Sequence, residues 1–464
     1  MRYLADGKDP ALPRPERLGG VLLFFFWLFM MSFAFDYRVR DGSGTSIFQY
    51  AFLAGGFFST GCLVLIGFRY LPSKPGGWIM IGWFLFLAYY LGNSFLQGVP
   101  LSRSLRTGLP FVLSFFAMLN SHIVASSGVR VAHLAAPILT TVVINIGWRM
   151  FHGFAFGEVD VTTVRAEILS PGLNWSAAFI GVCILLRSRF HWTMLLVAFL
   201  LFTAMLLSVT RALLFPMAAS AVGTFICYFF GMSQGAFLLR DLPRKLSPIL
   251  VATVASLVII VGLFLAFPTV ALRWQERLFS PTSDRNMASD PSLLTRQAEA
   301  KAIFDLLDES PVHYINGYGV GASFYWDDDY FPELYQVLDA EELEETSSDI
   351  WYAGHSIWTY SMFSGGFIAL ASFIGLFVTA VAFSLSSAAA NAANPGPDHW
   401  LLYLPVVATF CLLSESATSN PFDERLLGII FGATFSLSQA GFYRATWMAS
   451  QHQRSAQAAS PLIA

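Results

Sequence analysis

The sequence predicts an all-α, polytopic membrane protein with about twelve transmembrane helices and one large outer loop between the ninth and tenth helices. Of the 464 residues, 55% are hydrophobic and only 12% are charged, about half the charged fraction of an ordinary soluble domain. The mean hydropathy is +0.59. Long apolar runs recur along the chain, and one long polar segment, residues 268–355, interrupts them.

Twelve apolar runs are long enough to cross a membrane. A spanning helix needs about 20 mostly apolar residues, because the hydrocarbon core is about 30 Å thick and each residue rises about 1.5 Å. Helices are expected because lipid offers no water to unpaired backbone groups. The runs begin near Gly19, Ile47, Gly77, Gly108, Val131, Pro171, Trp192, Ala212, Pro248, Ser356, Trp400 and Leu426. Residues 19–267 therefore hold nine predicted spans, and residues 356–443 hold three.

The orientation follows from the distribution of Lys and Arg, which favour the cytoplasmic side in short loops. With the leader, residues 1–18, inside, inner segments carry fourteen Lys and Arg, and outer short loops carry eight. No small-residue cleavage site follows the first run, which ends before Asp36, so we expect an uncleaved span. Both termini are expected in the cytoplasm, with the tail, residues 444–464, disordered after Ser450.

The long loop, residues 268–355, is then placed on the outer side. It holds seventeen Asp and Glu against five Lys and Arg. We expect an amphipathic helix near Ser292 to Leu307. A turn-rich stretch follows around Gly317, Gly319 and Gly321, and then a strongly acidic segment.

Composition argues against several classes of protein. A net charge of −3 gives no basic field for nucleic acid. The four cysteines lie in apolar runs, typical of small buried hydrophobic residues rather than a disulfide framework. The acidic triplet Asp327-Asp328-Asp329 lacks the glycine and glutamate spacing of a calcium loop. We therefore expect no metal, no cofactor and no nucleic-acid partner.

Ionisable residues beside membrane spans are costly and are candidates for function. Arg211 lies at a tight outer junction between two spans, where its planar guanidinium could hold a phosphate. Arg296 lies on the predicted loop helix, and His355 lies where the chain re-enters the membrane, in a position suited to proton transfer. Arg149 and Glu415, at outer ends of spans, are candidate accessory residues.

Each of these residues also has a structural interpretation. Arg211 could extend its guanidinium to lipid headgroups. Arg296 could be a surface charge paired with Glu299 along the helix face. His355 could simply begin a helix at the interface, and Arg149 could be an interfacial anchor. Local sequence leaves these alternatives open.

The order of these motifs resembles the O-antigen ligase and O-antigen polymerase family of membrane glycosyltransferases. The resemblance covers residues 192–440. Its motifs are Thr210-Arg211, the Arg296 helix, Asn316-Gly317-Tyr318-Gly319-Val320-Gly321, Gly354-His355-Ser356 and Gly365-Gly366. The family transfers a glycan from an undecaprenyl-pyrophosphate donor to a sugar hydroxyl at the periplasmic face of the bacterial inner membrane, with inversion and without a metal.

Carried over by motif position, the resemblance implies that Arg211 and Arg296 bind the donor pyrophosphate and that His355 is the base. The acceptor is either a second lipid-linked repeat unit or lipid A-core. The acidic loop favours a polymerase of a surface or secreted polysaccharide, because it would repel the phosphates of lipid A-core. A flippase or transporter of lipid-linked glycan is an alternative; it would be expected to show paired repeats and charges at mid-membrane. A non-catalytic scaffold would tolerate replacement of His355.

Overall fold

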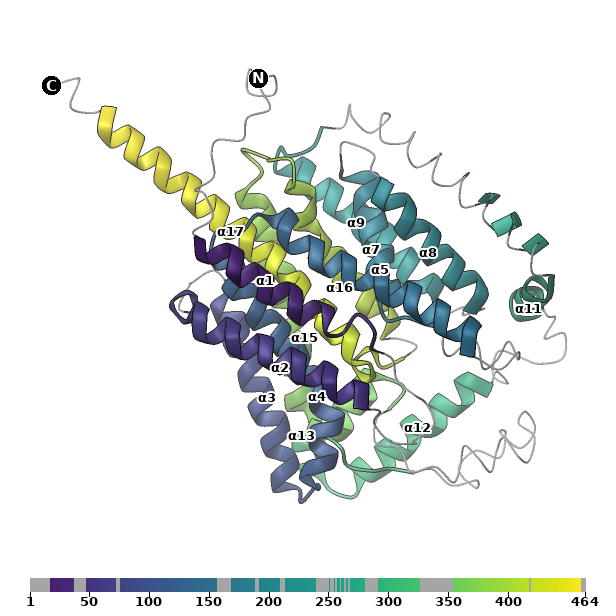
Figure 1. Ribbon diagram of the computed structural model, residues 1–464. Helices are drawn as coiled ribbons and strands as arrows, with labels where there is room; N and C mark the ends of the chain where they lie inside the picture. Colours follow the sequence, from purple (N-terminus) through teal and green to yellow (C-terminus); the bar gives the residue numbers. More distant parts are fainter. Residues whose placement is uncertain are drawn as a thin grey trace.

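A computed structural model of the protein describes residues 17–36, 47–71, 76–156, 168–187, 192–208, 213–238, 268–279, 291–325, 354–416 and 419–459, with residues 250, 254, 257, 258, 260–262, 264 and 265. Every regular element in these ranges is a helix, as predicted (Figure 1). The helices are α1 (Arg17–Met31), α2 (Ile47–Gly67), α3 (Gly77–Leu96), α4 (Leu101–Ser126), α5 (Val131–Phe156), α7 (Gly172–Leu185), α8 (Trp192–Ser208), α9 (Leu214–Ser233), α11 (Pro268–Phe279), α12 (Pro291–Asp308), α13 (Pro311–Asn316), α15 (Ile357–Ala390), α16 (Leu404–Glu415) and α17 (Arg425–Ala459). Short 3₁₀ helices are η1 (Phe68–Tyr70), η7 (His399–Tyr403) and η8 (Pro421–Asp423).

Seven of the described helices, namely α2, α3, α4, α5, α9, α15 and α17, are long and apolar enough to cross a membrane. Shorter apolar helices at Leu18–Met31, Gly172–Leu185, Met194–Ser208 and His399–Glu415 coincide with four more predicted spans. The run predicted near Pro248 lies largely outside the described residues. The helices of the described part thus have the character of a membrane protein, while the count of twelve spans stays a prediction.

Two predicted boundaries differ from the observed helices. Helix α4 begins at Leu101, seven residues before the predicted Gly108, because its first turns are polar and a hydropathy criterion passes over them. Helix α17 runs on to Ala459, so the prediction of disorder after Ser450 is wrong for that stretch. Ala, Gln and Arg there favour a helix even where no apolar face is needed.

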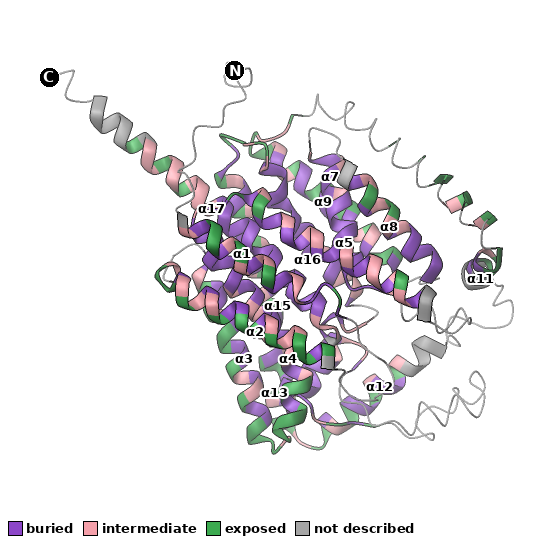
Figure 2. Cartoon of the chain, viewed as in Figure 1, coloured by how far each residue is buried: buried purple, intermediate pink, exposed green. Residues whose placement is uncertain are grey.

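Helices α4 and α17 form the centre of the bundle. The most apolar window of α17 is 89% buried and that of α4 is 72% buried, whereas the α2 window is only 28% buried. Figure 2 shows the same contrast, with exposed residues on α2 and α3. Large side chains such as Phe58 and Leu65 project from α2, as expected of a surface in contact with lipid.

Close packing of α17 on α4 depends on two glycines one turn apart. A Cβ at Gly428 would lie 2.8 Å from the carbonyl oxygen of Pro110, and a Cβ at Gly432 would overlap the carbonyl oxygen of Ser114. This G-x-x-x-G spacing lets two helix backbones approach in a membrane, where packing rather than the hydrophobic effect drives association. The central helix pair is therefore encoded by small residues.

Hydrogen bonds join α5 to the segment after α1. Asn145 of α5 donates to the backbone of Ala34 and Asp36, at 3.1 and 2.9 Å. Helices α12 and α13 lie far from the start of α1 and the end of α17 (Figure 1). Helix α13 packs on α15, and α12 packs on both. The described part of the long loop is therefore joined to the bundle.

Candidate active site

His355 is held by a buried carboxylate from the long loop. Its backbone N–H donates to Glu299 Oε1 at 2.8 Å, and its ring Nδ1 lies 2.5 Å from Glu299 Oε2. The side chain of Glu299 is 4% exposed, whereas that of His355 is 39% exposed. The carboxylate is thus hidden behind the ring, and the ring faces outward.

This geometry assigns the two ring nitrogens different roles. A carboxylate accepts hydrogen bonds, so Nδ1 is the nitrogen that carries a proton toward Glu299. Nε2 is then the nitrogen through which the half-exposed ring can take a proton from a bound molecule. The same carboxylate stabilises the imidazolium that forms when Nε2 is protonated, as in other His–carboxylate pairs.

Arg296 stands on α12, one turn before Glu299. Side chains three residues apart on a helix lie on neighbouring positions of one face. The guanidinium Nε is buried and has no hydrogen-bond partner among the described residues. Glu299 does not lie on an exposed face beside Arg296, as the structural interpretation of that arginine assumed; it is buried against His355. The loop helix therefore carries an arginine one turn from the carboxylate that contacts His355.

A break in α15 fixes the short segment that carries His355. Gly366 has φ 62° and ψ −161°, a conformation essentially confined to glycine, and a Cβ there would overlap the backbone of Ile315. The preceding residues, Ile357–Gly365, form a separate helical stretch. The sequence predicts an uninterrupted span here, and the break is a correction to that prediction.

The carbonyls of Phe363, Ser364 and Gly365, next to the break, each accept a hydrogen bond from outside α15. Tyr318 N donates to Phe363 O at 2.7 Å, and Gly319 N donates to Ser364 O at 2.9 Å. The hydroxyl of Tyr89 on α3 donates to Gly365 O at 2.9 Å. Buried carbonyls without such partners would cost free energy in a low-dielectric environment. The glycine-rich stretch predicted as a turn is therefore a backbone joint that locks the loop to the broken helix.

Side-chain packing completes the same joint. Ile303 and Leu307 of α12 form a buried cluster with Tyr360 and Phe363 of α15. This contact holds α12 against the short segment, which is what brings Glu299 to His355. The Tyr318 hydroxyl lies 2.6 Å from Leu306 O and 2.8 Å from Glu309 Oε2. Partial burial and then Glu309 raise the pKa of Tyr318 above its ordinary value, so this hydroxyl stays protonated.

The two candidate accessory residues belong to a polar network at the ends of α1, α5, α7, α16 and α17. Arg149 is 5% exposed, pairs with Glu424 at 2.8 Å and donates to Leu169 O. It is therefore a buried ion-pair partner rather than an interfacial anchor. Glu415 accepts a hydrogen bond from Asn174.

A second ion pair lies in this network. Arg425 contacts Asp36 at 2.6 Å. Burial raises the pKa of Asp36 to about 6, against the opposing effects of Arg425 and Arg149. Each member thus depends on its neighbours for compensation of its charge. Arg211, the second predicted phosphate ligand, lies outside the described residues, so its convergence with His355 stays a prediction.

Sequence reasoning missed Glu299 as the partner of His355, although one signal was available. Glu299 stands between Ala298 and Ala300 and four residues before Ile303, an apolar setting unusual for a solvated carboxylate. No protein-family model and no curated protein matches the chain. The resemblance to the O-antigen ligase and polymerase family therefore rests on the motifs of the chain itself.

Proposed function

We propose that the protein is a metal-independent, inverting membrane glycosyltransferase that moves a glycan from an undecaprenyl-pyrophosphate donor to a sugar hydroxyl at the periplasmic face of the inner membrane. The observation that carries this proposal is the half-exposed His355 ring, 2.5 Å from the buried Glu299 carboxylate on the helix that bears Arg296. This arrangement offers a base and a cation on adjoining surfaces, which is what the transfer requires.

The reaction makes one bond and breaks one bond at the anomeric carbon. His355 Nε2 takes the proton of the acceptor hydroxyl as its oxygen attacks that carbon from the face opposite the diphosphate. The bond to the diphosphate oxygen breaks, and the undecaprenyl pyrophosphate leaves with the bonding electrons. Arg296, together with Arg211 from the predicted site, stabilises the charge that develops there. General base catalysis of this kind contributes about 10²–10⁴-fold in rate.

An apolar surface borders the joint where the donor lipid would approach. Val312 and Ile315 of α13 are 56% and 55% exposed. Tyr314 stacks on Phe367, which is itself exposed just beyond the α15 break, with ring centroids 6.1 Å apart. A polyprenyl chain is hydrocarbon and would lie against such a surface in the membrane while its pyrophosphate stays at the polar end.

The acceptor is either a second lipid-linked repeat unit or lipid A-core. The first is favoured, so that the protein polymerises a surface or secreted polysaccharide. The segment 268–355 carries a net charge of −12, the balance of its seventeen acidic and five basic residues. That charge would repel the phosphates of lipid A-core more strongly than a second lipid-linked repeat unit. Attachment to lipid A-core remains the second candidate, and product length separates them: a polymerase yields a ladder of repeat numbers.

A flippase or transporter of lipid-linked glycan is less well supported. Broken helices in transporters usually expose backbone groups that bind ions or substrate. In α15 the carbonyls of Phe363, Ser364 and Gly365 are occupied by Tyr318, Gly319 and Tyr89. These carbonyls therefore join the long loop and α3 to α15 and are not left to bind an ion.

The test is transfer by purified protein from a lipid-linked glycan donor, with His355→Ala compared with the wild type. We expect His355→Ala to insert and remain stable but to lose transfer, so that the lipid-linked donor accumulates in cells. His133→Ala is the matched control, because that histidine is exposed at the opposite end of the bundle, at the start of α5. Normal transfer by the His355 variant would refute the catalytic assignment.

A further inference from the structure

A groove lies on the surface of the bundle where α3, α15 and α17 meet. Trp78 lines it from α3, Thr379, Ala382 and Ser386 line it from α15, and Phe442 lines it from α17. Its volume of about 480 Å³ falls within the range of about 300–1,000 Å³ that is typical of ligand sites. The hydroxyls of Thr379 and Ser386 donate to carbonyls of α15 itself. The described residues that line the groove include no charged side chain, so its walls suit hydrocarbon rather than a polar ligand.

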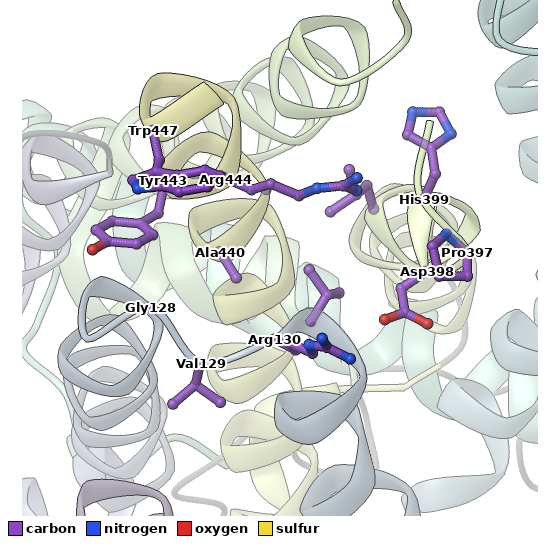
Figure 3. Close-up of a pocket in the computed structure, with 13 residues that line it drawn as sticks. Gly128, Val129, Arg130, Pro397, Asp398, His399, Ala440, Tyr443, Arg444 and Trp447 are labelled. Atoms are coloured by element: carbon purple, nitrogen blue, oxygen red, sulfur yellow. The ribbon is translucent and has the colours of Figure 1, made fainter. Parts of the chain in front are cut away.

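A second hollow, lined by Arg130, Asp398, His399 and Arg444, is far smaller. In Figure 3 the Arg444 side chain extends from α17 toward the turn that carries Asp398 and His399. The remaining space is about 30 Å³, enough for a water molecule or two. Of these two hollows, the groove is therefore the one with room for an organic ligand.

An exposed stripe of α15 leads from the break in that helix to the groove. Its members are Phe367, Ala371, Ile374, Val378 and Ala382, all of them exposed. They are spaced three or four residues apart, which places them on one face of the helix. Phe367 and Ala382 are fifteen residues apart, which is about 22 Å along a helix. The stripe therefore covers most of a hydrocarbon core about 30 Å thick.

Helix α3 runs beside α15 along the same stretch. Near the break, the Tyr89 hydroxyl donates to Gly365 O at 2.9 Å. At the groove, the rings of Trp78 and Phe383 lie with centroids 6.4 Å apart. The two helices thus border one apolar path that begins at the break and ends in the groove.

We propose that this path holds the polyprenyl chain of the lipid-linked donor, with the far part of the chain in the groove; the inference rests on the proposed transfer reaction. The path begins at Phe367, whose ring stacks on Tyr314 with centroids 6.1 Å apart, close to the segment that carries His355. A phospholipid acyl chain covers only half of the hydrocarbon core, about 15 Å. One such chain cannot follow the path from the break to the groove, whereas an undecaprenyl chain is long enough.

The experiment measures transfer by the purified full-length protein with two donors that carry the same glycan diphosphate. One donor is built on undecaprenol and the other on farnesol, whose chain is too short to reach from the break to the groove. Ala382→Trp fills the groove, and Ser386→Trp is a second variant should the first fold poorly. Ala54→Trp is the matched control, because Ala54 is likewise exposed but lies on α2, outside the groove.

Because lipid tails are as apolar as the groove, the chain gains from close packing rather than from leaving water. We therefore expect a modest effect, a KM about five- to tenfold lower for the undecaprenyl donor than for the farnesyl donor. Ala382→Trp should raise the KM for the undecaprenyl donor to the farnesyl value and leave the farnesyl KM unchanged. Ala54→Trp should change neither. Equal KM values for the two donors in the wild type, or equal effects of Ala54→Trp and Ala382→Trp, would overturn the proposal.

Retention of undecaprenyl phosphate by the purified protein, measured by native mass spectrometry, separates the groove from the transfer reaction. If no donor supports transfer but Ala382→Trp still weakens retention of undecaprenyl phosphate, the groove assignment holds and the transfer proposal fails. If transfer proceeds without any dependence on chain length, the transfer proposal holds and the groove assignment fails. Retention of phosphatidylethanolamine that equals that of undecaprenyl phosphate and falls equally in Ala382→Trp would show that the groove holds an ordinary phospholipid, and the proposal would be wrong.

Discussion

Glu299 accepts two hydrogen bonds from His355, one on each carboxylate oxygen. A glutamine has a single acceptor oxygen, so Glu299→Gln must lose one of the two contacts or present an N–H to a donor. We predict that Glu299→Gln lowers kcat about 10- to 100-fold, the usual cost of removing a residue that orients a histidine, with little change in the KM for the donor. Steady-state transfer kinetics measure both constants.

Glu299→Asp is the informative companion variant, because it keeps the charge and shortens the reach by one methylene. We expect it to recover part of the lost kcat. A purely structural role for Glu299 would predict a different pattern, in which both variants lose folded protein in proportion to activity. Equal transfer by Glu299→Gln and wild type would remove Glu299 from the mechanism.

Arg296 is expected to act on the donor rather than on the proton. We predict that Arg296→Gln raises the KM for the lipid-linked donor about tenfold and also lowers kcat, since one charge-assisted contact to a phosphate is lost. The conservative Arg296→Lys should recover binding only in part, because lysine cannot form two parallel hydrogen bonds. An unchanged KM in both variants would contradict a role in donor binding.

Only some residues of the candidate site could be predicted from the sequence. His355 and Arg296 were singled out by their position beside a span and on an amphipathic helix. The contact between His355 and Glu299 was not predicted, because it joins residues 56 positions apart and needs α12 to pack on α15. A helix-face argument alone paired Glu299 with Arg296, and burial against the His355 ring prevailed over that local pairing.

At the scale of elements, the break in α15 makes the stability of the protein depend on the glycine at position 366. Gly366→Ala should destabilise the protein by about 1–3 kcal/mol from backbone strain alone. Overlap with the backbone of Ile315 should add to that cost, because backbone cannot rotate away as a side chain can. We therefore expect a lower midpoint of thermal unfolding in detergent and a loss of transfer.

Gly375→Ala provides the control within the same helix. Among the described residues, no atom outside the local helix backbone and the two chain neighbours lies within 4 Å of a Cβ built at Gly375, so the alanine has room. Alanine there should be neutral or stabilising by up to about 1 kcal/mol. If the two variants unfold at the same temperature, the break is not a strained, glycine-dependent joint.

The helices could be predicted from the sequence where a pattern of apolar residues marks them. Apolar runs located the long helices, and the amphipathic pattern located α12 within one residue of Ser292 and of Leu307. The break at Gly366 was not predictable, because it depends on hydrogen bonds from Tyr318 and Gly319, almost fifty residues away. An apolar segment with two adjacent glycines is equally compatible with a continuous span.

At the scale of the whole molecule, the two polar ends of the bundle have different composition. One end holds the Asp36–Arg425 and Arg149–Glu424 pairs, in which each charge is compensated inside the protein. The other holds Arg130, Asp398 and Arg444, which line one cavity together with His399. The Lys and Arg count predicts that the second end faces the cytoplasm, and the proposed transfer requires the His355 site on the other side.

This sidedness can be measured with single cysteines and a membrane-impermeant maleimide. Among native cysteines, Cys183, Cys227 and Cys411 are buried and Cys62 is partly buried, so Cys62→Ala is the background. Lys301→Cys, exposed on α12 two residues after Glu299, should be labelled in intact spheroplasts. Arg69→Cys, exposed on η1, should be labelled only after the membrane is permeabilised. The reverse pattern would place the His355 site in the cytoplasm, where a polymer built on it could not reach the cell surface, and the proposed reaction would have to be abandoned even though the His355–Glu299 geometry still holds.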